Sequence, residues 1–279
     1  RNGEEAYQKI KSIKFDAIVL DINMPKMNGL ELLEKLKKEK IEVVVIMAST
    51  LTKEGSKETI RALELGALDF VTKPDTIIEA KGEDFASKLL MVLRGVLLGG
   101  GYISPKKTVN IPKHENQIRS SGNSKLVALA CSTGGPKALQ SVVPYLPKNL
   151  NAPVVLVQHM PKGFTKSMAD RLNELSDIFV KEAEDGERLE KGTVYVAPGG
   201  LHMMVETKRD GNNFIRLSMD PAIGGLRPCA NLMYESIKET NFDLITCVVL
   251  TGMGMDGMEG IRSLDKGKHI YTIAQDAET

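Results

Sequence analysis

Three residues of the types used in acyl transfer each follow a stretch of apolar residues. They are Ser132 after the run 126–130, His159 after the run 152–158, and Asp256 in a glycine-rich loop after the run 243–250. A serine hydroxyl is a weak nucleophile until an imidazole takes its proton, and the imidazole needs a carboxylate to fix its tautomer. Each residue also has a common structural role, as a helix cap, a hydrogen-bonding histidine or a turn former. Their occurrence together at three strand ends favours catalysis.

The turn that carries Ser132 has the pattern of a strand followed directly by a helix. The run 126–130 is short, apolar and followed by Gly134 and Gly135, which is typical of a strand buried on both faces of a parallel sheet. Pro136 suits the first turn of a helix, where its missing N–H costs nothing. We therefore expect Ser132 at the carboxyl end of a strand, where α/β sheets bind ligands and helix N–H groups stabilise negative charge.

A rival interpretation applies to the loop around Asp256. Gly252, Gly254 and Gly257 form the pattern G-x-G-x-x-G after a strand. Asp276 follows at about the 20-residue spacing of a dinucleotide-binding fingerprint. Asp256, however, would place a carboxylate in the loop meant to hold two phosphates, and the like charges would repel. We therefore rank nucleotide binding below catalysis.

The first part of the chain holds a second set of polar residues at strand ends. Apolar runs at 15–21, 42–48 and 67–72 end in or precede Asp21, Ser49 and Lys73, respectively. Amphipathic sequence such as 30–38 lies between them, and strands that alternate with helices predict a parallel α/β sheet. The carboxyl ends of parallel strands share one edge, so an acid, a hydroxyl and a lysine are expected to converge there.

Composition limits the classes of protein that the chain can belong to. Its 279 residues are enough for two domains, and its net charge of +1 gives no strong attraction to nucleic acid or anionic membrane. Three irregularly spaced cysteines favour a reducing compartment over a disulfide scaffold. The longest apolar run, 89–98, contains Arg94, is too short to span a bilayer and is expected to be a core helix. We expect a cytoplasmic protein that binds no nucleic acid and does not insert into membranes.

A change in composition divides the chain. Residues 99–124 are rich in Gly, Ser, Lys, Asn and Pro and lack a sustained apolar period, which is typical of a linker. We therefore predict one domain over residues 1–98, a linker over 99–124 and a second domain over 125–279.

The first domain resembles a response-regulator receiver. The motifs that carry the resemblance are LDINMP at 20–25, AST at 48–50 and TKP at 72–74. It implies a flavodoxin-like parallel sheet in which Asp21 accepts a phosphoryl group, Ser49 and Lys73 sense it, and Mg²⁺ assists. A carboxylate can accept a phosphoryl group, and a lysine can neutralise the added charge. Receivers begin with a strand that ends in an acidic pair for Mg²⁺; this chain has neither after Arg1, so we expect the metal site to be incomplete.

The second domain is similar to the chemotaxis protein-glutamate methylesterases, which carry a receiver ahead of a catalytic domain. The matching motifs are ACSTGG at 130–135, QHMPKGF at 158–164, EAEDGER at 182–188, APGGLHM at 197–203 and LTGMGMDG at 250–257. The resemblance implies a doubly wound parallel α/β domain with Ser132 as nucleophile, His159 as general base and Asp256 as its orienting acid. It also implies that the backbone N–H of Met253 helps to hold the oxyanion. The family extends beyond both ends of this sequence, so we expect truncation at both ends.

The same resemblance implies a function. It is that of a phosphorylation-regulated serine hydrolase that removes methyl groups from glutamyl methyl esters of chemoreceptors, releases methanol and also deamidates receptor glutamines. Hydrolysis needs no cofactor, the methyl-accepting chemoreceptors are the substrate, and a chemotaxis histidine kinase is the phosphodonor. The alternative is a receiver-regulated module that docks receptors without chemistry.

Several other residues have weaker signals. We expect His202 to be structural and Cys131 to be inert packing at the end of a buried strand. Cys229 and Cys247 lack metal-site spacing. Arg227 and Pro228 match a loop near the family's active site, and their role is left open.

Overall fold

The structure, a computed structural model, describes residues 2–74, 83–97 and 124–276. Apart from Ser124, the predicted linker at 99–124 lies outside the described residues, so the predicted domain boundaries stay predictions. Within the described residues, no helix is long and apolar enough to cross a membrane.

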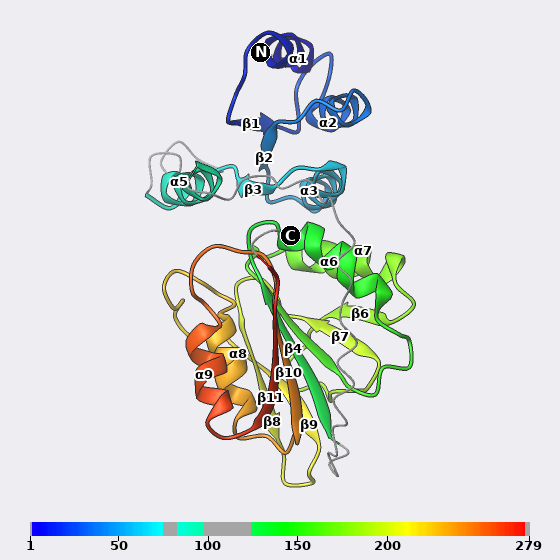
Figure 1. Cartoon of the computed structure of the whole chain (residues 1–279), viewed down its shortest axis with the longest axis vertical. Helices are drawn as coiled ribbons and strands as arrows, with labels where there is room; N and C mark the ends of the chain where they lie inside the picture. Colours follow the sequence, from blue (N-terminus) through cyan, green and yellow to red (C-terminus); the bar gives the residue numbers. More distant parts are fainter. Residues whose placement is uncertain (1, 75–82, 98–123, 277–279) are drawn as a thin grey trace.

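The first domain contains a parallel three-stranded sheet in the order β1-β2-β3, as the sequence predicted. Its strands are β1 (Ala17–Asp21), β2 (Val44–Ser49) and β3 (Asp69–Thr72), and its helices are α1 (Gly3–Ser12), α2 (Gly29–Lys38), α3 (Lys53–Leu65) and α5 (Glu83–Leu97). Figure 1 shows these helices around the short sheet. Asp21, Ser49 and Lys73 consequently lie at the same edge, because each ends or follows one of three adjacent strands.

Local sequence explains where these helices begin and which face they bury. Asn28 caps α2 in a capping box, in which its side chain accepts from Glu31 N while the Glu31 carboxylate accepts from Asn28 N. Leu32 and Leu36, one turn apart, are buried on its inner face.

The prediction that residues 89–98 form a core helix is only half right. In α5 Val92 is buried, whereas Leu90 and Met91 are 51% and 45% exposed, since only one face packs on β3.

The second domain is built on a parallel six-stranded sheet in the order β11-β10-β4-β5-β7-β6. Its strands are β4 (Lys125–Cys131), β5 (Val154–Gln158), β6 (Phe179–Glu182), β7 (Thr193–Val196), β10 (Leu244–Val249) and β11 (His269–Ala274). The chain proceeds from β4 through β5 to one edge and then returns to place β10 on the other side of β4. The switch point of the sheet, where α/β proteins bind ligands, therefore lies beside β4.

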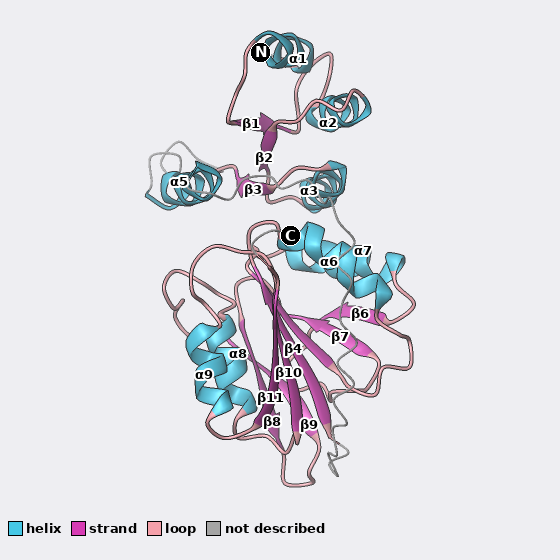
Figure 2. Ribbon diagram, viewed as in Figure 1, coloured by secondary structure: helices cyan, strands magenta, loops and turns pink. Residues whose placement is uncertain are grey.

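Helices cover both faces of this sheet (Figure 2). They are α6 (Gly135–Val142) and α7 (Phe164–Leu175) on one face, and α8 (Ala230–Ile237) and α9 (Met258–Asp265) on the other; a short 3₁₀ turn, η1 (Val143–Tyr145), follows α6. An antiparallel hairpin of β8 (His202–Thr207) and β9 (Asn213–Ser218) packs on α8. Alternate residues of the strands supply the two cores: Leu129 and Leu156 belong to the α6–α7 side, and Ala128 and Val155 to the α8 side.

The two domains share a packed interface. One cluster of buried apolar residues runs from the first domain into the second, where the rings of Phe70 and Phe164 lie 4.5 Å apart. Polar contacts between α3 and α7 lie beside it, with Ser56 Oγ 2.7 Å from Ser167 Oγ. Glu64 of α3 also forms an ion pair with Arg171 of α7.

Core packing on β5 gives a stability prediction. Leu156 is fully buried in the centre of the sheet, so Leu156→Ala should lower the free energy of unfolding of the second domain by about 2–5 kcal/mol, because it leaves a cavity. Urea unfolding followed by circular dichroism measures the change. Ile273→Ala on β11, where the side chain is 55% exposed, is the matched control and should cost less than about 0.5 kcal/mol. Equal losses in the two variants would contradict the described packing.

Candidate active site

Ser132 lies in a tight turn between β4 and α6. Its N–H donates to Thr251 O at 3.0 Å, and its carbonyl accepts from Gly135 N at 2.7 Å. Gly134 is the N-cap residue directly before α6 and has a φ of 76°, a left-handed conformation that glycine adopts without strain. The serine therefore sits at the carboxyl end of β4 with its main chain bonded on both sides.

His159 and Asp256 form a hydrogen-bonded pair beside this turn. His159 follows β5 and Asp256 follows β10, and these two strands flank β4. The His159 Nε2 atom lies 2.8 Å from Asp256 Oδ2, and the two side chains are only 13% and 8% exposed. A neutral imidazole that donates from Nε2 to the carboxylate leaves Nδ1 as its basic nitrogen.

The carboxylate of Asp256 also binds the beginning of α8. It accepts from Ala230 N at 2.6 Å, from Asn231 N at 2.9 Å and from Cys229 Sγ at 3.1 Å. Burial opposes ionisation of Asp256, but the hydrogen bonds from His159, the two N–H groups and the thiol outweigh burial and lower its pKa to about 2. The group is thus ionised at neutral pH and can stabilise a protonated imidazole.

The side chain of Asn231 in turn accepts hydrogen bonds from the chain that follows Asp256. Its side-chain Oδ1 accepts from Gly257 N at 3.0 Å and from Gly260 N at 2.7 Å, at the start of α9. Asp256 therefore caps α8, while Asn231 caps α9. Sequence analysis did not find Asn231 or the α8 amides, because a cap supplied by a distant loop leaves no local pattern.

The hydroxyl of Ser132 is not hydrogen-bonded to the His159–Asp256 pair. In the part of the chain that the structure describes, Ser132 Oγ has no hydrogen-bond partner, so the structure joins His159 to Asp256 but does not join Ser132 to His159. Catalytic hydrogen bonds are often long in structures without substrate and tighten in the complex. The loop after β10 nevertheless touches the serine, since a Cβ at Gly252 would lie 2.9 Å from Ser132 Cβ.

Met253 lies in the same loop and contacts the first domain. Its side chain packs against Gly95 of α5 so closely that a Cβ at Gly95 would lie 1.7 Å from Met253 Sδ. The predicted oxyanion residue is therefore located at the domain interface. The loop that was weighed as a dinucleotide fingerprint instead presents its carboxylate to His159 and α8.

The three predicted residues of the first domain lie together, since Lys73 N donates to Ser49 O at 2.6 Å, but only the side chains of Asp21 and Lys73 pair. Lys73 Nζ lies 2.6 Å from Asp21 Oδ2, and Asp21 Oδ1 accepts from Asn23 N at 2.9 Å. The Ser49 hydroxyl is bonded elsewhere, since it donates to Gly55 O at 3.1 Å and accepts from Thr59 Oγ1 at 2.6 Å. Lysine and acid are thus already paired, and the hydroxyl is held by α3.

The residues present do not fit a complete Mg²⁺ site. Among the described residues there is no group of three histidine, cysteine, aspartate or glutamate side chains that could hold a metal ion. Asp21 supplies one carboxylate and is paired with Lys73, whereas Mg²⁺ needs an octahedral set of oxygen ligands.

The structure also shows the surroundings of the residues whose sequence signals were weaker. His202 is fully buried, and its Nε2 lies 3.1 Å from Pro221 O, as expected of a structural imidazole. Arg227 donates to the carbonyls of Met219 and Asp220 and so braces the loop before α8. Burial raises the pKa of the Cys131 thiol, which fits inert packing. Burial also raises the pKa of Cys229 to about 11 and that of Cys247 to about 12.

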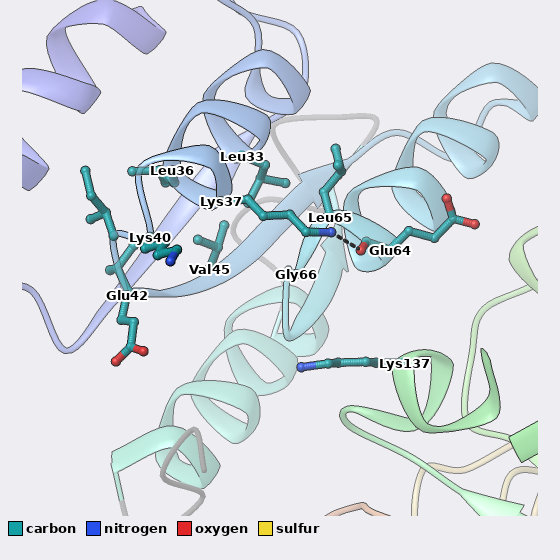
Figure 3. Close-up of a pocket in the computed structure, with 12 residues that line it drawn as sticks. Leu33, Leu36, Lys37, Lys40, Glu42, Val45, Glu64, Leu65, Gly66 and Lys137 are labelled. Carbon is teal, nitrogen blue, oxygen red and sulfur yellow. Dashed lines mark hydrogen bonds between the residues drawn. The ribbon is translucent and has the colours of Figure 1, made fainter. Parts of the chain in front are cut away.

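A hollow of about 350 Å³ lies in the first domain beside the start of β2 (Figure 3). It is lined by the end of α2, the residues that lead into β2 and the end of α3, and Lys137 of α6 extends toward it. Lys37 Nζ lies 3.5 Å from Glu64 O across its rim. None of the residues predicted for chemistry lines it, so it is not the candidate active site.

Together, the fold and the site define a class of protein: a receiver domain joined to a parallel α/β domain with serine, histidine and aspartate at the ends of three adjacent strands. The CheB methylesterase family model matches residues 127–279, and the response regulator receiver domain model matches residues 1–80. The chain belongs to the CheB methylesterase family, which confirms the predicted family and fold class.

Individual relatives agree with this assignment. The protein-glutamate methylesterase/protein-glutamine glutaminase of Bacillus licheniformis is 42% identical over 288 residues, which cover 100% of this chain and 80% of the relative. The protein of the same name from Clostridium acetobutylicum is 43% identical over 260 residues, which cover 93% of this chain and 73% of the relative. The crystal structure of the Thermotoga maritima CheB methylesterase catalytic domain is 42% identical, covers 53% of this chain and 78% of that chain, and has a TM-score of 0.50.

The hydrogen bonds of Asp256 predict a pH-dependent contribution to stability. Its pKa of about 2 lies below the value of about 3.9 expected in an unfolded chain, so its contribution is fully present above about pH 4 and is lost as the pH falls toward 2. The difference in unfolding free energy between the wild-type protein and Asp256→Asn should therefore shrink as the pH falls from about 4 toward 2. Thermal or urea unfolding across this range measures it, and a difference that grows on acidification would contradict the depressed pKa.

Proposed function

We propose that Ser132, His159 and Asp256 act as a catalytic triad that hydrolyses glutamyl methyl esters on chemoreceptors. Membership of the family makes the chain an enzyme of the protein-glutamate methylesterase class, and the comparisons do not support the alternative of a binding module without chemistry. The observation that carries the residue assignment is the His159–Asp256 hydrogen bond at the ends of the two strands that flank β4, the strand of Ser132.

The proposed reaction proceeds through an acyl-enzyme. Ser132 Oγ attacks the ester carbonyl carbon while His159 Nδ1 takes the hydroxyl proton, and the Asp256 carboxylate stabilises the imidazolium. The tetrahedral oxyanion is held by N–H donors that include the backbone of Met253. Methanol leaves with the proton from His159, and water then releases the glutamate by the reverse sequence. With a glutamine side chain the leaving group is ammonia, so the same residues would deamidate.

The partners follow from the two domains. We propose that a chemotaxis histidine kinase phosphorylates Asp21, that Lys73 and Ser49 respond to the added charge, and that the protein works in the cytoplasm. Asp21 would supply one carboxylate to Mg²⁺, but the described residues do not complete that site, so no step is assigned to the metal. Hydrolysis would need no cofactor. The Lys73–Asp21 ion pair supports the role of these two side chains, because a phosphoryl group on Asp21 would bind the lysine more strongly.

The domain interface supports steric control of the site. The receiver helix α5 packs on Met253 through Gly95, and α3 and β3 contact α7, which begins five residues after His159. A receiver in this position would hinder a bulky receptor helix more than a small ester. Phosphorylation of Asp21 would release the block by the difference in docking free energy between the two receiver states.

Substitution of the nucleophile tests the chemistry. Ser132→Ala should abolish methanol release from a methylated receptor while the unfolding transition stays near that of the wild type, because a small hydroxyl without a hydrogen-bond partner contributes little stability. His159→Ala should be comparably inactive. The released methanol is measured enzymatically, and turnover by Ser132→Ala near the wild-type rate would refute the triad.

A larger side chain at the interface tests the control. Gly95→Leu should displace α5 from Met253 and raise the rate on methylated receptors several-fold without phosphorylation, with little change for a small ester. Ala86→Leu, at an exposed position of the same helix, is the matched control. Cleavage within 99–124 and removal of the receiver should have the same effect as Gly95→Leu. Unchanged receptor turnover in both would mean that the receiver does not cover the site.

A further inference from the structure

Gln158 is a buried amide whose hydrogen bonds join the two candidate catalytic segments. It is the last residue of β5 and is only 2% exposed. Its Nε2 lies 3.0 Å from Ser132 O and 3.4 Å from His159 O, and its Oε1 lies 3.0 Å from Cys131 Sγ. One side chain therefore contacts the residue before the serine, the serine itself and the histidine.

The chemistry of these neighbours fixes the orientation of the amide. The two carbonyl oxygens can only accept, and the thiol of Cys131 donates to an oxygen, so only one of the two amide orientations allows all three contacts. Gly135 provides the space, since a Cβ at this position would lie 1.9 Å from Gln158 Oε1. The glycine that begins α6 thus serves the amide as well as the helix.

The hydrogen bond from Gln158 to Ser132 O adds to the bonds that hold the main chain of Ser132. Thr251 O holds the N–H of Ser132, while Gly135 N and Gln158 Nε2 occupy its carbonyl. A residue has two soft backbone dihedrals, and bonds at both adjacent peptide groups restrict both. The direction of the Ser132 Cα–Cβ bond is thereby restricted relative to β5, the strand that leads into His159.

We propose that Gln158 is a positioning residue that sets the geometry between Ser132 and His159. It acts through the two backbones and does not touch the reacting atoms. This inference rests on the proposed function of Ser132 and His159, and it explains how a serine without a partner for its hydroxyl is kept in register with the imidazole. Errors of about 1 Å in such a geometry can cost about 100-fold in rate.

Two substitutions separate positioning from simple packing. Gln158→Leu removes the donor and keeps much of the volume; it should lower kcat for a small activated ester by about 10–100-fold and leave KM within about twofold. Gln158→Glu keeps the shape, and its carboxyl group can donate to Ser132 O only when protonated. Its activity relative to wild type should therefore rise as the pH is lowered, whereas a packing role predicts a constant ratio.

Control variants and stability measurements distinguish a positioning role of Gln158 from loss of folding. Cys131→Ser, which retains a donor to Gln158 Oε1, should stay near wild-type activity. Thermal unfolding is recorded for each variant, and the pH dependence of Gln158→Glu decides the question where Gln158→Leu does not fold. A folded Gln158→Leu with wild-type kcat, or a Gln158→Glu ratio that does not vary with pH, would overturn the inference. Ser132→Ala is assayed in parallel: its activity would refute the proposed triad, whereas its inactivity beside active Gln158 variants would refute only the role of Gln158.

Discussion

The hydrogen bonds of the Asp256 carboxylate are the interaction on which the arrangement of the site depends. A buried carboxylate is unfavourable unless donors surround it. Here the donors are the imidazole of His159, the N–H groups of Ala230 and Asn231, and the thiol of Cys229. Because these groups come from two segments that are distant from Asp256 in the chain, the charge that orients the imidazole also joins the start of α8 to the loop before α9. The same contacts therefore lower the pKa of Asp256 and hold these segments of the fold together.

A second set of constraints connects the receiver with the hydrolase. Phe70 lies on β3, three residues before Lys73, and it packs on Phe164 at the start of α7. Lys73 is paired with Asp21, and α7 begins shortly after His159. A change of charge at Asp21 can therefore act on a packed interface that adjoins the loops of the candidate active site. Packed interfaces shift between discrete arrangements more readily than they deform continuously, which suits a switch.

At two glycines the candidate site leaves no space for a side chain. A side chain at Gly252 would strike Ser132, and one at Gly135 would strike Gln158. Both glycines allow two segments of the chain to approach closely. Neither has a positive φ, so the reason for glycine here is space and not backbone conformation. The glycine pattern that resembled a dinucleotide fingerprint is thus explained, at Gly252, by close contact with the turn that carries Ser132.

The sequence by itself determined the family, the two parallel sheets, and the strand ends that carry Ser132, His159, Asp256 and Asp21. Apolar runs and the residues that follow them are local features, so these positions could be predicted to within one or two residues. The hairpin β8–β9 and helix α8 were not predicted, and only the tertiary structure placed Asn231 and the α8 amides on Asp256, Gln158 on Ser132, and Gly95 on Met253. These contacts join residues that are far apart in the chain, or they depend on the direction of a side chain from its strand. They arise from the order in which the strands assemble and the way the two domains pack, and no local pattern of residue types specifies either.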